Sequence, residues 1–447
     1  MNNEIKRRLT DLQRRFRQQP NAVPLRAILG ETSWLASAKL VSGFANFAAS
    51  AAIARSLGPG SFGSLSLAVT LALTVGLLST LGMEQLCSRD SASFKTELER
   101  NRFFQSVSQL RLVGALIGLA FMLVVSQTQW ADEINAQHLI IVLCLLPIAQ
   151  IGDINEWRLV SVGRSREVAL STLIVAPSFA VLRLIGALVG CDPLVFCWIV
   201  VAEVALRSQF LARFSGAELT LRPKAWDPNT SRKLVWESLP MLLSAIAVTI
   251  YMRLDQFMLS VFWGATAAGW YVGAVIIYDM CNMFPLLLFR TLLPELSKRE
   301  AASPNSSTDL LVFFLRHTFL ASLILATAVA TGANFVITFL FGSGYIQSAP
   351  ALQILCATLP FVSLGVLANA WFIMKGLTRM LMVRTLFGLL LNVTLNFLLI
   401  PEAGIIGAAT ATLITQVFVS LLMDAMLPST RPLFFIKMRA LGLSQRP

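Results

Sequence analysis

Long runs of apolar residues, separated by short polar segments, occupy nearly the whole chain. A helix needs about 20 such residues to cross a bilayer, because its backbone must satisfy its own hydrogen bonds there. The pattern therefore predicts an all-α polytopic membrane protein with about 12 transmembrane helices. These are expected at residues 33–54, 64–83, 108–127, 138–157, 168–190, 194–213, 237–262, 266–293, 317–341, 349–373, 379–400 and 404–427.

Pro147 and Pro360 lie inside the fourth and tenth runs, and we expect each to kink its helix. The longest polar segments, around residues 84–106 and 214–235, are too short to fold alone. Connections on the side predicted to be external are shorter still. This disfavours a membrane glycosyltransferase or polymerase, whose acid/base residues usually lie on long external loops.

Composition agrees with the pattern. Of 447 residues, 56% are apolar and only 13% are charged, about half the share of an ordinary soluble chain. The mean hydropathy of +0.70 excludes a disordered or purely water-soluble protein. The net charge of +12 is compatible with nucleic acid, acidic lipid or membrane topology, so the positions of the basic residues must decide.

Basic residues cluster on one side of the predicted membrane. On this topology 32 of the 36 Lys and Arg lie on that side, Arg55 lies on the other, and Lys39, Arg183 and Arg253 lie inside spans. The positive-inside rule then places both termini in the cytoplasm and leaves no basic surface for nucleic acid. The basic segment 1–32 lacks a secretory cleavage pattern. Its apolar residues recur at helical spacing, which suits a helix on an anionic leaflet or a solvated leader.

The chain contains an internal repeat. LGPGSFG at residues 57–63 matches WGATAAG at 263–269 with an offset of 206, and a Leu-Pro segment at 146–157 matches 359–371 with an offset of 213 to 214. Unless this similarity arose by chance, it predicts two parallel six-helix lobes around a central cavity. The predicted parts are a basic cytoplasmic segment 1–32, an N-lobe 33–213, a cytoplasmic linker 214–236, a C-lobe 237–427 and a basic cytoplasmic tail 428–447.

Several segments carry a resemblance to a known family. They are RSLGPGSFG at 55–63, residues 82–89, RLDQ at 253–256 with GWY at 269–271, FGSGY at 341–345 and LNFLLIP at 395–401. Their order and spacing over residues 30–425 resemble bacterial polysaccharide-unit flippases. These belong to the multidrug/oligosaccharidyl-lipid/polysaccharide exporter superfamily. The superfamily also contains cation-coupled drug antiporters, and lipid II flippases, which generally carry extra helices.

The resemblance implies export of an undecaprenyl-diphosphate-linked oligosaccharide across the bacterial cytoplasmic membrane. Its implied partners are this lipid-linked oligosaccharide and membrane lipids, with a polysaccharide polymerase and assembly proteins as further candidates. Such a cargo needs a polar cavity with cations for the diphosphate, while its tail stays in lipid. Charged residues inside spans are the candidates, because each is costly unless it faces a cavity or a partner.

Arg253 is the first candidate for gripping the diphosphate, because it lies deep in its span and a guanidinium forks onto phosphate oxygens. Asp255, two residues on, lies about 200° around the helix, so one of the two faces the cavity and the other pairs between helices. Structural pairing is the alternative for Arg253. Asp279 and Arg290 are eleven residues apart and share one face of the eighth span.

Other candidates are weaker. Lys39 and Arg183 are further deep cations, although Lys39 could snorkel to the interface and the fifth span, with Arg183, could be peripheral. Asn392 and Asn396, one turn apart, could bind sugar hydroxyls or join helices. The deep basic residues are at least as many as the deep acidic ones. The basic residues are Lys39, Arg183 and Arg253, and the acidic ones are Asp255 and Asp279. This favours an anionic cargo over the runner-up, a cation-coupled drug antiporter, which would need a carboxylate-dominated cavity.

Asp153 and Glu156 are candidate coupling carboxylates that would bind a proton or a cation. The alternative is an interfacial cap in which they pair with Arg158 or Arg164. The sequence has no HExxH, GxSxG or P-loop pattern and no CxxC pair, so we expect no catalytic residue, metal or cofactor. Only Cys191 and Cys197 could both face the oxidising side and form a disulfide.

Overall fold

A computed structural model describes residues 25–90, 97–216, 228–302 and 307–443. These residues fold into helices joined by short turns, with no strand among them. Nine of the helical segments in the described part are long and apolar enough to cross a membrane. The chain is therefore an all-α, multi-pass membrane protein.

The elements follow one another as α2 (Leu25–Leu78), α3 (Met83–Asp90), α4 (Glu97–Ser126), α5 (Gln129–Glu133), α6 (Gln137–Leu143), α7 (Leu146–Ala149), the 3-10 turn η1 (Gln150–Gly152), α8 (Asp153–Ser161), α9 (Ser165–Val189), α10 (Pro193–Ser215), α11 (Pro228–Ala302), α12 (Thr308–Thr331), α13 (Ala333–Phe341), the 3-10 turn η3 (Ser343–Tyr345), α14 (Ser348–Met374), α15 (Thr378–Val417), the π-helical turn η4 (Phe418–Leu422), α16 (Met423–Met426) and α17 (Arg431–Ala440).

Three of the long helices are broken at a glycine. Gly58 in α2, Gly264 in α11 and Gly404 in α15 have positive φ values of 72°, 79° and 53°, which a residue with a Cβ rarely adopts. Each of these three helices covers two predicted spans. The nine long segments therefore correspond to the twelve apolar runs of the sequence. The number of twelve membrane crossings stays a prediction.

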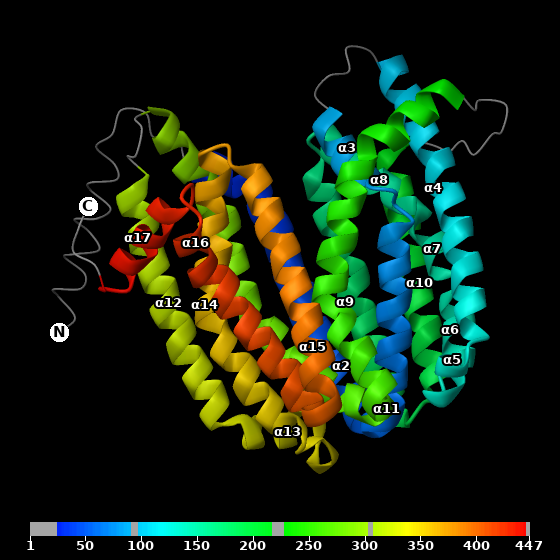
Figure 1. Cartoon of the computed structure of the whole chain (residues 1–447). Coiled ribbons are helices and arrows are strands. Elements are labelled where there is room, and N and C mark those ends of the chain that lie inside the picture. The colour runs from blue at the N-terminus through cyan, green and yellow to red at the C-terminus, as the bar shows by residue number, and fades with distance from the viewer. Residues whose placement is uncertain (1–24, 91–96, 217–227, 303–306, 444–447) are drawn as a thin grey trace.

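The helices form two bundles (Figure 1). One contains α3 to α10 and the other contains α12 to α17, while α2 and α11 pack against each other and contact both bundles. We call the end of the molecule that carries Gly58, Gly264 and Gly404 the glycine-turn end, and the opposite end the far end. This two-bundle architecture is what the internal repeat predicts.

The apolar core is shared at one end and divided at the other. Ala54, Tyr271 and Tyr345, near the glycine-turn end, belong to one large core that joins both bundles. Toward the far end, separate cores form around Phe104 in the first bundle and Trp371 in the second. The bundles are therefore joined most firmly at the glycine-turn end.

The two limbs of α11 end in different bundles. Leu234, in its first limb, is buried in the core of the first bundle, whereas Leu292 and Leu296, in its second limb, are buried in the core of the second. The first limb, predicted to open the C-lobe, thus begins against helices of the first bundle. The helix turns between the bundles at Gly264.

The prolines and the tail modify the predicted pattern. The fourth predicted span is interrupted around Pro147, where α6, α7, η1 and α8 follow one another as short pieces. The tenth, α14, runs through Pro360 without a break. The tail, predicted only as a basic segment, contains the helix α17, which packs against α12, α14 and α16.

Candidate functional site

At the glycine-turn end the two repeats touch through their backbones. A Cβ atom on Gly63 would lie 2.0 Å from the carbonyl oxygen of Ala265, and one on Gly269 would lie 2.0 Å from that of Pro59. Both pairs are related by the offset of 206, so the contact is symmetric. Only glycine permits such a close approach, and the two turns therefore close this end of the molecule.

Tryptophan side chains add hydrogen bonds around this closure. Trp263 Nε1 donates to the carbonyl of Ile400 at 2.8 Å, and Trp270 Nε1 donates to the carbonyl of Gly344 at 2.9 Å. Trp130 Nε1, from the first bundle, donates to Ser260 Oγ at 3.0 Å. Residues far apart in sequence thus hold the glycine-turn end together.

Arg253 and Asp279 form a loose ion pair between the two limbs of α11. Arg253 Nη1 lies 3.9 Å from Asp279 Oδ2, and the side chains are 38% and 41% exposed. They stand eleven and fifteen residues from Gly264, roughly 16 and 22 Å along the helix. Because contact between a charged side chain and lipid would be costly, the exposure of both side chains makes this pair a candidate for binding a polar ligand.

The other acidic and basic candidates of α11 behave differently. Asp255 is buried, and its Oδ2 accepts a 2.6 Å hydrogen bond from the Tyr271 hydroxyl on the second limb. Asp255 therefore pairs between the two limbs, whereas Arg253 keeps 38% of its side chain exposed. The side chain of Arg290 lies outside the described residues, so its relation to Asp279 stays a prediction.

Asn392 and Asn396 are buried in α15, where Asn396 Nδ2 donates to Asn392 Oδ1 at 3.0 Å. Arg183 is also enclosed, since its guanidinium pairs with Glu203 of α10 and donates to Asn46 of α2 at 2.9 Å. Arg183 thus joins α9 to α2 and α10, whereas the hydrogen bond between the two asparagines lies within α15. Lys39, by contrast, is exposed on the first limb of α2.

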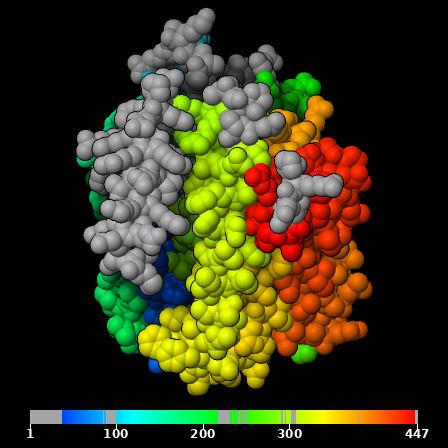
Figure 2. All heavy atoms as spheres, turned by 90° about the vertical axis from the view of Figure 1, so that its left-hand side faces the viewer, coloured from blue at the N-terminus to red at the C-terminus, as the bar shows by residue number. Residues whose placement is uncertain are grey.

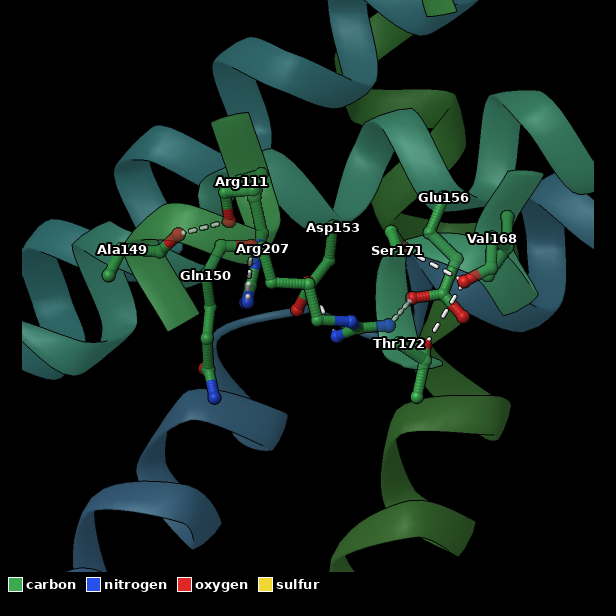
Figure 3. A network of polar contacts seen from close by, with 10 residues as sticks. Arg111, Ala149, Gln150, Asp153, Glu156, Val168, Ser171, Thr172 and Arg207 are labelled. Carbon is green, nitrogen blue, oxygen red and sulfur yellow. Dashed lines mark hydrogen bonds and ion pairs between the residues drawn. The ribbon is translucent and has the colours of Figure 1, made fainter. Parts of the chain in front are cut away.

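Asp153 and Glu156 share one arginine, Arg207, which lies within the predicted span 194–213 and was not among the candidates. Arg207, from α10, binds Glu156 and lies 3.6 Å from Asp153 (Figure 3). The proposed alternative partners, Arg158 and Arg164, pair elsewhere, with Asn101 and Glu167. The cap interpretation was therefore wrong about the partner, because helix α10 carries Arg207 back toward α8.

A cavity of about 280 Å³ adjoins this cluster, between α2, α3, α4, η1 and α8. Its polar lining includes Thr80, Glu84, Arg111, Gln150, Asp153 and Glu156. Arg111 is only 1% exposed, and its Nη1 donates to the carbonyl of Gly76 at 3.0 Å and to Ser79 Oγ at 2.6 Å. Sequence reasoning missed Arg111 and Glu84, because their partners lie on helices distant in the sequence.

Glu84 stands at the end of this cavity, in α3. Burial raises the pKa of its carboxyl, as does the neighbouring carboxylate of Glu156, while Lys39 and Arg111 act in the opposite direction. The cluster therefore holds a carboxyl that takes up a proton more readily than an ordinary glutamate. The interaction with Lys39 connects the cluster to the first limb of α2.

A second, fully buried ion pair lies in the other bundle. Lys437 Nζ of α17 is 2.5 Å from Asp424 Oδ2 and donates to the carbonyl of Ser420 at 2.7 Å. Arg384 Nε donates to the carbonyl of Val419 at 3.0 Å. Both carbonyls belong to the π-helical turn η4, whose wider hydrogen-bond pattern accompanies these bonds to cations.

Within the described ranges, no group of three or more His, Cys, Asp or Glu residues could hold a metal ion. Cys191 and Cys197 are both free, so the disulfide considered from the sequence does not form. The charged clusters found here are therefore ion pairs and hydrogen-bond networks.

Comparison with known proteins agrees with this architecture. A sequence profile of the polysaccharide biosynthesis protein family matches residues 28–300, and one of the lipid II flippase MurJ matches residues 169–443. An uncharacterized membrane protein of Methanocaldococcus jannaschii is 26% identical over 199 residues. That match covers 43% of this chain, and the chain spans about half, 45%, of that relative.

Solved structures share the fold. The lipid II flippase MurJ in an inward closed conformation has a TM-score of 0.69 at 15% identity, over 91% of this chain and 90% of that one. An inward-facing multidrug resistance MATE family transporter of the MOP superfamily has a TM-score of 0.65 at 14% identity, over 91% and 95%. A MOP superfamily transporter from Pyrococcus furiosus, with a reverse-polarity binding pocket, has a TM-score of 0.60 at 14% identity. That match covers 96% of this chain and 100% of the transporter.

Proposed function

The chain belongs to the polysaccharide biosynthesis family of flippases, within the multidrug/oligosaccharidyl-lipid/polysaccharide exporter superfamily, and we propose that its cargo is an undecaprenyl-diphosphate-linked oligosaccharide. The solved structures that share its fold include a multidrug resistance transporter and a lipid II flippase. We propose that the chain works in the bacterial cytoplasmic membrane, with both termini cytoplasmic, as the distribution of basic residues predicts.

The observation that carries this proposal is the exposed ion pair of Arg253 and Asp279. At 3.9 Å the pair is loose, and both side chains keep more than a third of their surface open. The Arg253 guanidinium makes one long contact with Asp279, but it can make two forked hydrogen bonds to a diphosphate. A diphosphate can therefore displace Asp279 from Arg253. Lys39 is a second exposed cation that could reach the same cargo.

The closure at the glycine-turn end supports a mechanism of alternating access. The bundles share a core there and have separate cores toward the far end, which on the predicted topology is cytoplasmic. We propose that cargo enters from the far end while the glycine contact is closed. Rocking of the bundles would then separate Gly63 from Ala265 and open the external side.

Asp153 and Glu156 remain the proposed coupling carboxylates, now joined by Glu84. Arg207, Arg111 and Lys39 oppose these three carboxylates. If the diphosphate takes Lys39 away from Glu84, the cluster is left with one uncompensated negative charge. A proton or a small cation entering the adjoining cavity would neutralise it, which would link cargo binding to ion uptake.

The test is a flipping assay in proteoliposomes with a labelled undecaprenyl-diphosphate oligosaccharide. We expect Arg253→Ala to slow flipping at least about tenfold, the equivalent of about 1.4 kcal/mol in the barrier. Arg299→Ala is the matched control, because Arg299 is on the same helix and pairs with Glu295 at 2.7 Å. Full activity of Arg253→Ala would remove that residue from the mechanism. Absence of any flipping by the wild-type protein would overturn the cargo.

Asp279 supports a second candidate, a cation-coupled multidrug antiporter. It is as exposed as Arg253, and a carboxylate in that position suits a cationic drug. Efflux of ethidium by cells expressing the protein, lost in Asp279→Asn and kept in Arg253→Ala, would favour this function. Incorporation of sugar by the purified protein would instead revive an enzymatic role.

A further inference from the structure

The tail helix α17 has two chemically different faces. Leu433, Lys437 and Ala440 point into the second bundle and are buried. Arg431, Phe435 and Arg439 point outward and are exposed, Phe435 by 56%. A helix that combines arginines and a large apolar residue on its outward face is typical of segments that lie in a membrane interface.

The buried face fixes the orientation of α17. Lys437 is fully buried against Asp424 and the carbonyl of Ser420, and Leu433 is 0% exposed in the core of the second bundle. A helix held by a buried ion pair cannot roll to hide its other face, because breaking that pair leaves an unpaired charge inside the protein. Arg431 and Arg439 must therefore remain on the outside.

Ion pairs also place α17 level with the ends of membrane spans. Arg439 Nη1 lies 3.1 Å from Asp309 Oδ1, in the first turn of α12. Asp424, the partner of Lys437, lies in the last turns of the candidate span that ends at Met426. In Figures 1 and 2, α17 lies on the outer side of the second bundle. On the predicted topology the outward face is therefore level with the cytoplasmic ends of these candidate spans, where headgroups would lie.

We propose that the outward face of α17 binds the headgroups of anionic phospholipids, with Arg431 and Arg439 contacting phosphate and Phe435 lying among the upper acyl chains. Arginine binds phosphate with forked, charge-assisted hydrogen bonds. A basic residue beside an anionic leaflet is attracted to its surface. The competing pair of Arg439 and Asp309 is weak, because Asp309 is 84% exposed. The proposal does not rest on the identity of the cargo.

The experiment compares lipid binding by the full-length protein in nanodiscs of phosphatidylcholine with and without phosphatidylglycerol. We expect phosphatidylglycerol to raise the melting temperature of the wild type and to stay bound to it in native mass spectra. Arg431→Ala/Arg439→Ala should lose most of that shift and retain several-fold less phosphatidylglycerol. High salt should reduce the difference, since the attraction is electrostatic.

Two controls make the result specific. Arg164→Ala/Arg166→Ala removes the same charge at the start of α9 and should keep the wild-type lipid response. Phe435→Ser keeps both arginines and should weaken retention of phosphatidylglycerol less than the double arginine variant.

Equal retention of phosphatidylglycerol by the wild type and by Arg431→Ala/Arg439→Ala would overturn the proposal. So would a dimer in pure phosphatidylcholine that the double variant dissociates, because the face would then bind a second copy. Arg253→Ala should keep the lipid response, which separates this test from that of the cargo.

Discussion

The two halves of the repeat pack alike but carry different charges. A Cβ atom on Gly152 would lie 2.3 Å from Ser208 Cβ, and one on Gly365 would lie 2.8 Å from Ser420 Oγ. These glycines are 213 residues apart and the serines 212, so the repeat places the same close helix contact in each bundle. In both bundles this helix contact is made by a glycine and a serine. Neither residue is charged.

The charges beside this contact belong to one half only. In the first bundle, Asp153 and Glu156 bind Arg207. At the corresponding offsets the second bundle has Val366, Ala370 and Val419, which carry no charge. The fold therefore forms without an acidic cluster in the second bundle. This difference supports a functional role for the cluster in the first, as proposed for ion coupling.

The second bundle uses its cations in another way. Arg384 and Lys437 bind the carbonyls of Val419 and Ser420 in the π-helical turn. There the cations satisfy the backbone and attach the tail helix. Arg207 thus balances two carboxylates in one half, whereas Arg384 and Lys437 bind a helix distortion in the other.

The largest expected effect comes from what the halves share. Gly63→Val and Gly269→Val should each lower stability by about 3 kcal/mol, because overpacking against a carbonyl forces the two turns apart. The symmetry of the contact predicts similar losses for the two variants, measured by thermal unfolding and by flipping. Gly60→Ala is the milder control, since its Cβ would meet only Thr266 Oγ1 at 3.3 Å. A large loss in one variant alone would show that the two turns are not equivalent.

The next effect tests what the halves do not share. Arg207→Gln removes the cation that Asp153 and Glu156 share, and we expect a loss of about 2 kcal/mol in the free energy of unfolding, because the side chains are only partly buried. Arg207→Gln/Asp153→Asn/Glu156→Gln removes all three charges and should recover most of that stability. If the cluster couples ions, the triple variant should still transport at a rate independent of the ion gradient. Gradient-dependent transport by the triple variant would contradict the coupling role.

The sequence predicted the helices well and their partners poorly. Periodicity separated Arg253 from Asp255, and the repeat located the breaks at Gly58 and Gly264, because both depend on local geometry. Arg207 lies in the predicted span 194–213, but it was not recognised as the partner of Asp153 and Glu156, which α10 brings close to it. Its partners are about 50 residues away in the chain, and helical spacing gives the face of a residue without giving what packs against that face.

The tail was missed for a related reason. Leu433, Lys437 and Ala440 recur at helical spacing, but a lysine in the middle of the series hid the buried face. The partner that makes its burial tolerable, Asp424, lies in the preceding span. A basic tail is therefore compatible with a solvated segment or a docked helix until that carboxylate is placed.

Over a single pH unit, the smallest effect is a dependence of stability on pH that arises in the second half. Burial, and then the nearby Arg384, lowers the pKa of Lys437 from 10.5 to about 7, against the opposing carboxylate of Asp424. Between these values the unfolded chain binds more protons than the folded one, so the free energy of unfolding should rise with pH from about 7 to 10. The slope is at most about 1.4 kcal/mol per pH unit.

This slope can be measured by thermal unfolding of the wild type and of Lys437→Met/Asp424→Asn at several pH values. The double variant should have a flatter profile, because it lacks the shifted lysine without leaving Asp424 charged and unpaired. Parallel profiles would mean that Lys437 titrates as an ordinary lysine.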